Sequence, residues 1–463
     1  MALIKSISGI RGTIGGKSGE ALTPIDIVKF AAAFGSWVVE KTNNPKIVIG
    51  RDARISGPMV SQLITATLQG MGLEVIDLGL STTPTVELAV PLEHAGGGII
   101  ITASHNPIQW NALKLLGSSG EFISDEDGKA VLEKAEKEDF NFATVKKLGK
   151  YTPKNDYLDK HIDHVLNLEL VDTKAIAARN FKVVIDCVNS TGGIVIPKLL
   201  KALGVEVVEE LYCDPNGDFP HNPEPLPENL RDIAKKLENG HFDLGIVVDP
   251  DVDRLAFFCE DGSFFGEEYT IVAVADYVLS KTPGNTVSNL SSSRALKDVT
   301  LRRGGDYHAS AVGEVNVVHK MKEVNALIGG EGNGGVIYPA SHYGRDALVG
   351  IGLFLTHLAQ FGKSASRLRA TYPNYHISKN KIELTPGIDM DRILDAIKLK
   401  YKKHPIIDID GVKIEFEKEW VHLRKSNTEP IIRIYSESDS QATADHLANK
   451  IILDIKEVIS ETI

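Results

Sequence analysis

Apolar runs of strand length alternate with helical patterns over most of the chain, and this alternation limits the fold more than any other feature. Strands are predicted at residues 47–52, 74–78, 99–101, 181–187, 205–211 and 244–248, and helices at residues 23–41, 58–70 and 125–139. Such alternation is typical of parallel βαβ units. From about residue 373 the pattern changes. Strands predicted at 412–417, 420–423 and 431–436 precede one helix at 440–459, which indicates a small α+β unit.

The composition is that of a globular protein with enough apolar residues for a large core. Hydrophobic residues make up 43% of the 463 positions, charged residues make up 24%, and the net charge is −11. An acidic chain has no overall field that attracts nucleic acid or an anionic membrane, so local cations must hold any phosphate ligand. The three cysteines are far apart, no apolar run reaches the ~20 residues of a membrane span, and the first residues lack a signal-peptide pattern. We therefore expect a cytoplasmic protein.

A serine stands where α/β proteins usually carry their chemistry. The apolar run at residues 98–101 stops at Thr102, and Ser104 follows, just before the turn-forming sequence His-Asn-Pro. The hydroxyl of Ser104 therefore lies at the carboxyl end of a predicted buried strand, the usual edge for ligand binding in such sheets. Alone, this sequence is an ordinary strand-to-loop transition. Its significance depends on what the rest of the chain supplies.

Three aspartates follow the predicted strand at residues 244–248. Asp249, Asp251 and Asp253 alternate with other residues, so an extended backbone directs all three carboxylates to one side. Crowded carboxylates repel one another unless a cation lies among them, and an all-oxygen ligand set favours Mg²⁺ or Ca²⁺ over zinc. An EF-hand loop needs glycine where Arg254 stands, and haloacid-dehalogenase phosphatases need threonine or valine where Asp253 stands. The aspartates therefore predict a site for one hard divalent cation.

Two further motifs combine glycine or turn residues with groups that bind sugars and phosphates. A glycine-rich loop carries Glu331 and Asn333, which can bind vicinal sugar hydroxyls, and its glycines permit close approach of a ligand. A later turn offers Arg424, two hydroxyls and an amide, a combination suited to phosphate. Near the N-terminus, the glycine-rich residues 8–18 fail the P-loop spacing because Arg11 stands where the first glycine is required.

Taken in order, the serine loop, the aspartates, the glycine-rich loop and the turn Arg-Lys-Ser-Asn-Thr-Glu-Pro resemble the α-D-phosphohexomutase superfamily. That family includes phosphoglucomutase/phosphomannomutase and phosphoglucosamine mutase, and the resemblance spans the whole chain. It implies a heart-shaped α/β protein of four domains, in which three similar α/β domains precede a smaller α+β domain. We expect these domains at residues 1–150, 151–254, 255–372 and 373–463, with strands near 256–260 and 286–290 in the third.

The resemblance also implies roles for individual residues. Ser104 would carry a phosphoryl group and bind one Mg²⁺ together with the three aspartates. The other residues implied in catalysis are Arg11, His105, Lys114 and Arg254, with Arg11 and Lys114 as candidates for proton transfer. The residues implied in substrate binding are Glu331, Asn333, Arg424, Ser426, Asn427, Thr428 and Arg433. On the sequence alone, Lys114 would be a surface lysine, and Arg254 could simply pair with a neighbouring aspartate.

The implied activity is the interconversion of a hexose 6-phosphate and a hexose 1-phosphate. It would proceed through phospho-Ser104 and a bound 1,6-bisphosphate, with glucose 1,6-bisphosphate or an equivalent sugar bisphosphate as activator. The chain departs from the commoner pattern Gly-Glu-x-Ser-Gly-His, because Asn333 replaces the serine and Gly335 replaces the histidine. Whether His342 substitutes for that histidine stays open.

The glycine-rich variant and the start Ser-Gly-Ile-Arg-Gly favour phosphoglucosamine mutase over phosphomannomutase/phosphoglucomutase. Two alternatives come from other classes: a metal-dependent sugar phosphatase, and a catalytically silent protein that binds a sugar phosphate. The expected partner is a small phosphosugar, with no nucleic acid and no membrane. The sequence leaves both monomer and homodimer open.

Overall fold

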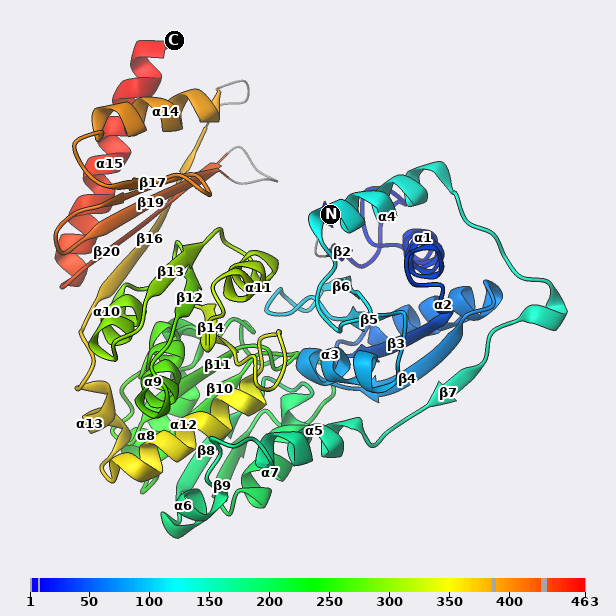
Figure 1. The fold of residues 1–463 in the computed structure, drawn as a ribbon, viewed down its shortest axis with the longest axis horizontal. Helices are drawn as coiled ribbons and strands as arrows, with labels where there is room; N and C mark the ends of the chain where they lie inside the picture. The colour runs from blue at the N-terminus through cyan, green and yellow to red at the C-terminus, as the bar shows by residue number, and fades with distance from the viewer. Residues whose placement is uncertain (1, 7–8, 385–388, 426–430, 463) are drawn as a thin grey trace.

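A computed structural model of the protein describes residues 2–6, 9–384, 389–425 and 431–462. Its strands form four sheets of seven, four, four and five strands, each built from a consecutive part of the chain. In Figure 1 the first unit, blue to cyan, lies beside the green and yellow second and third units, and the orange to red fourth unit stands above them. This architecture confirms the predicted four-domain α/β fold. No helix in the described ranges is long and apolar enough to cross a bilayer.

The first sheet, in the order β1-β2-β6-β5-β3-β4-β7, positions the serine loop. Its strands are β1 (Leu3–Ser6), β2 (Gly9–Thr13), β3 (Lys46–Arg51), β4 (Glu74–Leu80), β5 (Gly97–Ile101), β6 (Trp110–Leu116) and β7 (Tyr151–Pro153). Its helices are α1 (Pro24–Thr42), α2 (Gly57–Gly70), α3 (Thr83–Leu92) and α4 (Asp125–Lys137), with a 3₁₀ turn at Val145–Lys147. Strand β5 is buried at every residue, and apolar clusters cover both faces of this sheet. Ser104 therefore follows a strand at the centre of a covered sheet.

The second sheet, in the order β11-β10-β8-β9, carries the aspartate loop. Its strands are β8 (Lys182–Asp186), β9 (Glu206–Leu211), β10 (Leu244–Val248) and β11 (Leu255–Cys259). The helices of this part of the chain are α5 (Tyr157–Leu166), α6 (Thr173–Ala178), α7 (Gly192–Ala202) and α8 (Arg231–Asn239), with a 3₁₀ turn at Pro227–Asn229. Strand β11 pairs antiparallel with β10. It therefore belongs to the second sheet and not to the third unit, in which the sequence analysis placed it.

The third sheet, in the order β13-β12-β14-β15, carries the glycine-rich loop between β14 and β15. Its strands are β12 (Thr286–Asn289), β13 (Tyr307–Ser310), β14 (Ile328–Glu331) and β15 (Gly335–Ile337). The helices are α9 (Glu267–Lys281), α10 (Ala295–Arg302), α11 (Glu314–Glu323), α12 (Ala347–Phe361) and α13 (Ala365–Arg369). One apolar core joins the second and third units, and in it Phe257 of β11 stacks on Phe354 of α12 with ring centroids 3.8 Å apart. The aspartate loop and the glycine-rich loop thus rest on a common close-packed support.

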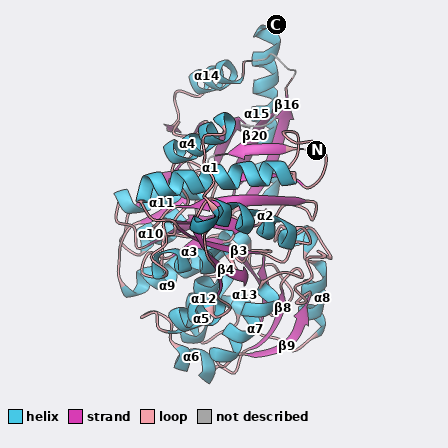
Figure 2. Ribbon diagram, turned by 90° about the vertical axis from the view of Figure 1, so that its right-hand side faces the viewer, coloured by secondary structure: helices cyan, strands magenta, loops and turns pink. Residues whose placement is uncertain are grey.

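The fourth sheet, in the order β16-β20-β19-β18-β17, is antiparallel throughout. Its strands are β16 (His376–Glu383), β17 (Ile406–Ile407), β18 (Val412–Glu415), β19 (Trp420–Lys425) and β20 (Ile431–Ser438), and its helices are α14 (Met390–Lys400) and α15 (Gln441–Thr462). In Figure 2, α14 and α15 stand at one end of the molecule, opposite α6 and β9. The sequence analysis missed β16, β17 and α14. The domain limits expected after residues 150, 254 and 372 stay predictions.

Candidate active site

The serine loop turns sharply just beyond β5. Ser104 adopts a left-handed backbone with φ of 49°, which is uncommon for a residue other than glycine. Its N–H donates to Thr102 Oγ1 at 2.9 Å, and its side-chain Oγ donates to Asp249 Oδ2 at 3.1 Å. The Nδ1 atom of His105 lies 3.4 Å from the same Oγ. The predicted reactive serine and the predicted cation ligands are therefore neighbours, although 145 positions separate Ser104 from Asp249.

A buried arginine that the sequence analysis missed holds this loop in shape. The guanidinium of Arg54, which is fully buried, is anchored by its Nε donating to Asp52 Oδ2 at 3.0 Å. Its other nitrogens donate to the carbonyl oxygens of Ser104, Asn106, Pro107 and Trp110 at 2.6, 2.6, 2.8 and 3.0 Å. The planar fork of arginine suits several acceptors at once, whereas lysine offers a single point charge. Arg54 thus fixes both ends of the serine loop.

We expect Arg54→Met to damage both stability and activity. The substitution keeps much of the apolar volume but takes the guanidinium from four carbonyl oxygens and leaves the buried Asp52 carboxylate without its cationic partner, at a cost of about 3–5 kcal/mol for the broken buried pair. The free energy of unfolding in urea and the rate of the enzyme measure the two effects. Arg303→Ala, which removes one of two arginines that pair with Asp276, is the control. Wild-type stability of Arg54→Met would contradict the clamping role.

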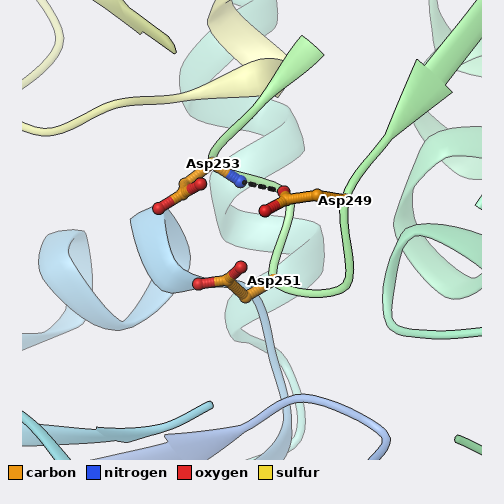
Figure 3. Close-up of side chains that lie close together, drawn as sticks. All are labelled: Asp249, Asp251 and Asp253. Carbon is orange, nitrogen blue, oxygen red and sulfur yellow. Dashed lines mark hydrogen bonds between the residues drawn. The ribbon is translucent and has the colours of Figure 1, made fainter. Parts of the chain in front are cut away.

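The three aspartates of the predicted cation site converge beyond β10. Asp249, Asp251 and Asp253 are fully buried, and one carboxylate oxygen of each lies within 4.8 Å of those of the other two. Figure 3 shows the three carboxylates directed toward a common space, with the Asp253 N–H donating to Asp249. The alternating spacing in the sequence therefore does place the three side chains together.

The backbone of the aspartate loop is strained, and hydrogen bonds from other parts of the chain hold it in place. Val252 adopts a φ of 61°, which is a genuine outlier for a β-branched residue and costs about 1–3 kcal/mol. The hydroxyls of Ser190 and Thr191 donate to the carbonyl of Pro250 at 2.6 and 2.9 Å, and Thr83 N–H donates to the carbonyl of Asp251 at 2.9 Å. Contacts from the first and second units thus keep the loop in a conformation that it would not adopt alone.

The donor set fits a divalent cation. The Oδ1 atoms of Asp251 and Asp253 are buried and have no hydrogen-bond partner among the described residues, which is costly for a carboxylate oxygen. Burial, and then repulsion from Asp253 and Asp251, raises the pKa of Asp249 well above its usual value. Burial also opposes ionisation of Asp253, but Arg345 and Lys114 lower the pKa of Asp253 below its usual value. A cation among the three would satisfy the unpaired oxygens and relieve the repulsion.

Lys114 contacts the aspartates, and its prediction as a surface lysine is wrong. The side chain is only 15% exposed, and its Nζ lies 2.7 Å from Asp251 Oδ2 and 3.4 Å from Asp253 Oδ2. Strand β6 lies between β2 and β5, and this pairing, which the sequence does not reveal, brings Lys114 to the cation site. Burial opposes its charge, but Asp251 and Asp253 raise the pKa of Lys114 above its usual value. Lys114 is therefore an ammonium group.

Positive side chains surround Ser104. A cavity of about 160 Å³ is lined by Ser104 together with Arg11, Lys114, Arg254 and Arg345. His105 also lines this cavity, and burial and the charge of Arg254 lower its pKa to about 2, so its imidazole is neutral. Cationic donors around a hydroxyl are the environment that a phosphoryl group on that hydroxyl needs.

A larger cavity of about 1390 Å³ adjoins the first and is lined by residues of all four units. The two cavities share Arg11, His105, Asn106 and Arg254. The larger cavity is also lined by Arg424 and Arg433, which stand directly opposite each other on β19 and β20. Like charges in this position destabilise a sheet unless an anion lies between them. Burial and the charge of Arg433 also lower the pKa of Arg11, so a second cluster of cations faces the cavity.

The predicted substrate-binding residues that the structure describes all line this larger cavity: Glu331, Asn333, Arg424 and Arg433. The Oε1 atom of Glu331 accepts hydrogen bonds from Asn289 Nδ2 at 2.7 Å and from Gly313 N–H at 3.2 Å. The predicted residues Ser426, Asn427 and Thr428 lie outside the described residues. The Nε2 atom of His342 donates to Asp346 Oδ2 at 3.0 Å, and His342 is not among the described residues that line either cavity.

Comparison with known proteins agrees with this arrangement. Sequence models of the phosphoglucomutase/phosphomannomutase family match four successive segments: alpha/beta/alpha domain I at 3–142, domain II at 159–262, domain III at 266–375 and the C-terminal domain at 381–453. A phosphoglucomutase/phosphomannomutase of Thermococcus kodakarensis is 37% identical over 94% of this chain and 95% of its own. A phosphoglucosamine/phosphogalactosamine mutase of Sulfurisphaera tokodaii is 31% identical over 97% of this chain and 98% of its own.

The solved structure of a phosphoglucomutase/phosphomannomutase family protein from Burkholderia thailandensis superposes with a TM-score of 0.84 at 26% identity, covering 98% of this chain and 97% of that one. The chain therefore belongs to the α-D-phosphohexomutase superfamily. Its members are isomerases that act by intramolecular phosphoryl transfer, and this protein is an enzyme of that class.

Proposed function

We propose that the protein interconverts a hexose 6-phosphate and the corresponding hexose 1-phosphate through phospho-Ser104 and a sugar 1,6-bisphosphate. One observation carries this proposal: cations gather at two places in one cavity system. The first group surrounds Ser104 and the second is built around Arg424 and Arg433, while Arg11 lines both cavities and senses the charge of Arg433. A single phosphate would need one such group, whereas a ligand with a phosphate at each end needs two.

Each group in the first cavity has a role in this proposal. Asp249, Asp251 and Asp253, with an oxygen on Ser104, would hold one Mg²⁺, which neutralises charge on the transferring phosphoryl group. Arg254 adds a guanidinium to the same phosphate. It also lies 3.6 Å from Glu224, which lines the larger cavity. Phosphoryl transfer depends mostly on such positioning and charge neutralisation.

The transfer exchanges one phosphorus–oxygen bond for another. The bond from phosphorus to Ser104 Oγ breaks, a bond to the free sugar hydroxyl forms, the hydroxyl loses its proton and Ser104 regains one. We propose Lys114 and Arg11 for these proton transfers. Lys114 carries a proton and lines the same cavity as Ser104, so it can donate to the leaving Ser104 oxygen, although its raised pKa makes it a weak acid. The lowered pKa of Arg11 makes it a better proton acceptor than an ordinary arginine.

The bisphosphate must then turn round, so that its other phosphate returns to Ser104. Both ends of the cavity system therefore have to accept either phosphate, while Glu331 and Asn333 hold the sugar hydroxyls between them. Glucose 1,6-bisphosphate or an equivalent would restore the phosphoserine when it is lost. We infer glucosamine 6-phosphate as the preferred substrate, because Glu224 and Glu331 line the cavity and would face its ammonium group. Phosphomannose and phosphoglucose are the alternatives.

Turnover assays test the proposed function. Glucosamine 6-phosphate, mannose 1-phosphate and glucose 1-phosphate are each incubated with enzyme, Mg²⁺ and catalytic glucose 1,6-bisphosphate, and both isomer and inorganic phosphate are measured. The proposal expects isomer, with the fastest conversion for glucosamine 6-phosphate. Inorganic phosphate without isomer would identify a metal-dependent phosphatase instead.

Arg424→Ala is expected to raise KM for the sugar phosphate on the order of 10- to 100-fold with a smaller change in kcat, because charged hydrogen bonds to the phosphate that is not transferred are lost. Asp410 holds Arg424 in place, with Oδ2 2.9 Å from Nε. The neighbouring Lys425 pairs with Asp391 instead, so Lys425→Ala is the control and should keep the wild-type KM. If KM of Arg424→Ala is unchanged, the second phosphate site is misplaced.

A further inference from the structure

The side chain of Arg345 fills the space next to Gly335. A Cβ atom built on Gly335 would lie 2.3 Å from Cδ and 3.0 Å from Cγ of Arg345, so no side chain fits at position 335 while Arg345 is in place. A bridge between Ile337 and Arg345 holds this arginine against β15. The commoner family pattern has histidine at the position of Gly335. The exchange of histidine for glycine therefore makes room for an arginine that comes from ten positions later in the chain.

The guanidinium of Arg345 binds three carboxylates that come from three different elements. Nη2 lies 2.7 Å from Asp253 Oδ2, Nη1 lies 3.0 Å from Glu331 Oε2, and Nε lies 3.0 Å from Glu314 Oε2. Its backbone N–H also donates to Glu314 Oε1 at 2.9 Å. Arg345 is 7% exposed, and it lines the small cavity around Ser104. It therefore connects the aspartate loop with the glycine-rich loop at the point where these loops meet.

We propose that Arg345 is a positioning residue for phosphoryl transfer, which takes the place of the family histidine and sets Glu331 relative to Asp253. This inference rests on the proposed function. Glu331 is the group proposed to hold the sugar, and Asp253 is one of the ligands proposed for the cation, so the distance between them fixes the sugar hydroxyl relative to the phosphoryl group. A planar fork that holds both carboxylates sets this distance directly. Arginine stays charged over the whole working pH range, so its own charge does not limit this link.

The kinetic test uses Arg345→Ala and Arg345→Lys. The control for the loss of an arginine ion pair is Arg303→Ala, since Arg303 is not among the described residues that line either cavity. We expect kcat of Arg345→Ala to fall on the order of 10²-fold, since misplacement of reacting groups by about 1 Å costs that much. Lysine should restore only part of kcat, because a point charge cannot hold Glu331 and Asp253 together. Folded Arg345→Ala enzyme, checked by circular dichroism, with wild-type kcat and KM would show a merely structural ion pair and overturn the proposal.

A second test introduces histidine at position 335, with and without the removal of the Arg345 side chain. Gly335→His should lower the melting temperature because the new side chain collides with Arg345, and the double variant Gly335→His/Arg345→Ala should recover part of the loss. A double variant that is no more stable than Gly335→His would overturn the exchange.

The melting temperatures separate this inference from the proposed function. They report the collision and its relief whether or not the enzyme isomerises any of the sugars tested. Absence of isomerisation by the wild type would therefore refute the proposed function, while recovery of stability in the double variant would still support the exchange of histidine for Arg345.

Discussion

Ser104→Ala is expected to abolish isomerisation, with kcat lowered at least about 10⁴-fold, as is usual when the group that forms the covalent intermediate is removed. Ser104 lines the small cationic cavity, and its hydroxyl donates to Asp249. Alanine leaves the loop backbone and the cations in place but provides no oxygen to carry the phosphoryl group. The measurement is the rate of isomer formation in the presence of Mg²⁺ and glucose 1,6-bisphosphate.

The control for this variant is Ser263→Ala. Ser263 is exposed in the turn between β11 and α9, its hydroxyl donates to Asp261, and it lines neither cavity, so its loss should leave the rate unchanged. Binding of the sugar phosphate by Ser104→Ala should persist, because the second group of cations is intact. Isomerisation at an undiminished rate by the alanine variant would refute the phosphoserine pathway.

Asp251→Asn is expected to lower kcat by about 10³-fold and to weaken the dependence on Mg²⁺, since a divalent cation supplies several kcal/mol of stabilisation to such a transition state. Asparagine keeps the shape of the side chain but removes one of three buried negative charges. It also removes the closer of two carboxylate partners of Lys114, whose Nζ lies 2.7 Å from Asp251 Oδ2 and 3.4 Å from Asp253 Oδ2. The Mg²⁺ concentration that gives half-maximal activity measures the weakened binding.

Thermal unfolding tests the same cation site without an activity assay. A cation that binds only the folded protein raises the melting temperature, so Mg²⁺ should stabilise the wild type and have little effect on Asp251→Asn. Asp261→Asn, in an exposed turn, should behave like the wild type. Chelation of divalent ions should also stop the wild-type reaction, and added Mg²⁺ should restore it. Full activity of Asp251→Asn at ordinary Mg²⁺ concentrations would refute the assignment of the cation site.

Much of the fold follows from local sequence. Strands β5 and β10 are continuous apolar runs that end in polar residues, and both are buried at every position. Helix α1 starts at the predicted place because Thr23 and Asp26 form a capping box and Pro24 stands in the first turn. Strand β16 was missed because its sequence His-Ile-Ser-Lys-Asn-Lys-Ile-Glu is mostly polar and lies at a sheet edge. The sequence analysis placed β11 in the wrong unit, because the sequence of a short apolar strand does not reveal the strand with which it pairs.

Some residues of the site could likewise be predicted from local sequence, and others could not. The spacing of Asp249, Asp251 and Asp253 is a local signal, and it led directly to the cluster. Lys114 was misjudged, because its surroundings depend on the pairing of β6 with strands far away in the sequence. Arg54 was missed because it acts on carbonyl oxygens about fifty positions further on, although its place just beyond the buried strand β3 was an available signal. The close contact between Arg345 and Gly335 was missed because it arises only in the folded chain, and no local sequence pattern indicates it.

The most direct test of the account follows one phosphoryl group. Enzyme labelled on Ser104 with radioactive glucose 1,6-bisphosphate is freed of excess label and mixed with an unlabelled hexose monophosphate for a single turnover. The account predicts that the label leaves Ser104 and appears in the sugar phosphate as rapidly as the enzyme turns over. Label that stays on the protein, or that is released as inorganic phosphate, would contradict it.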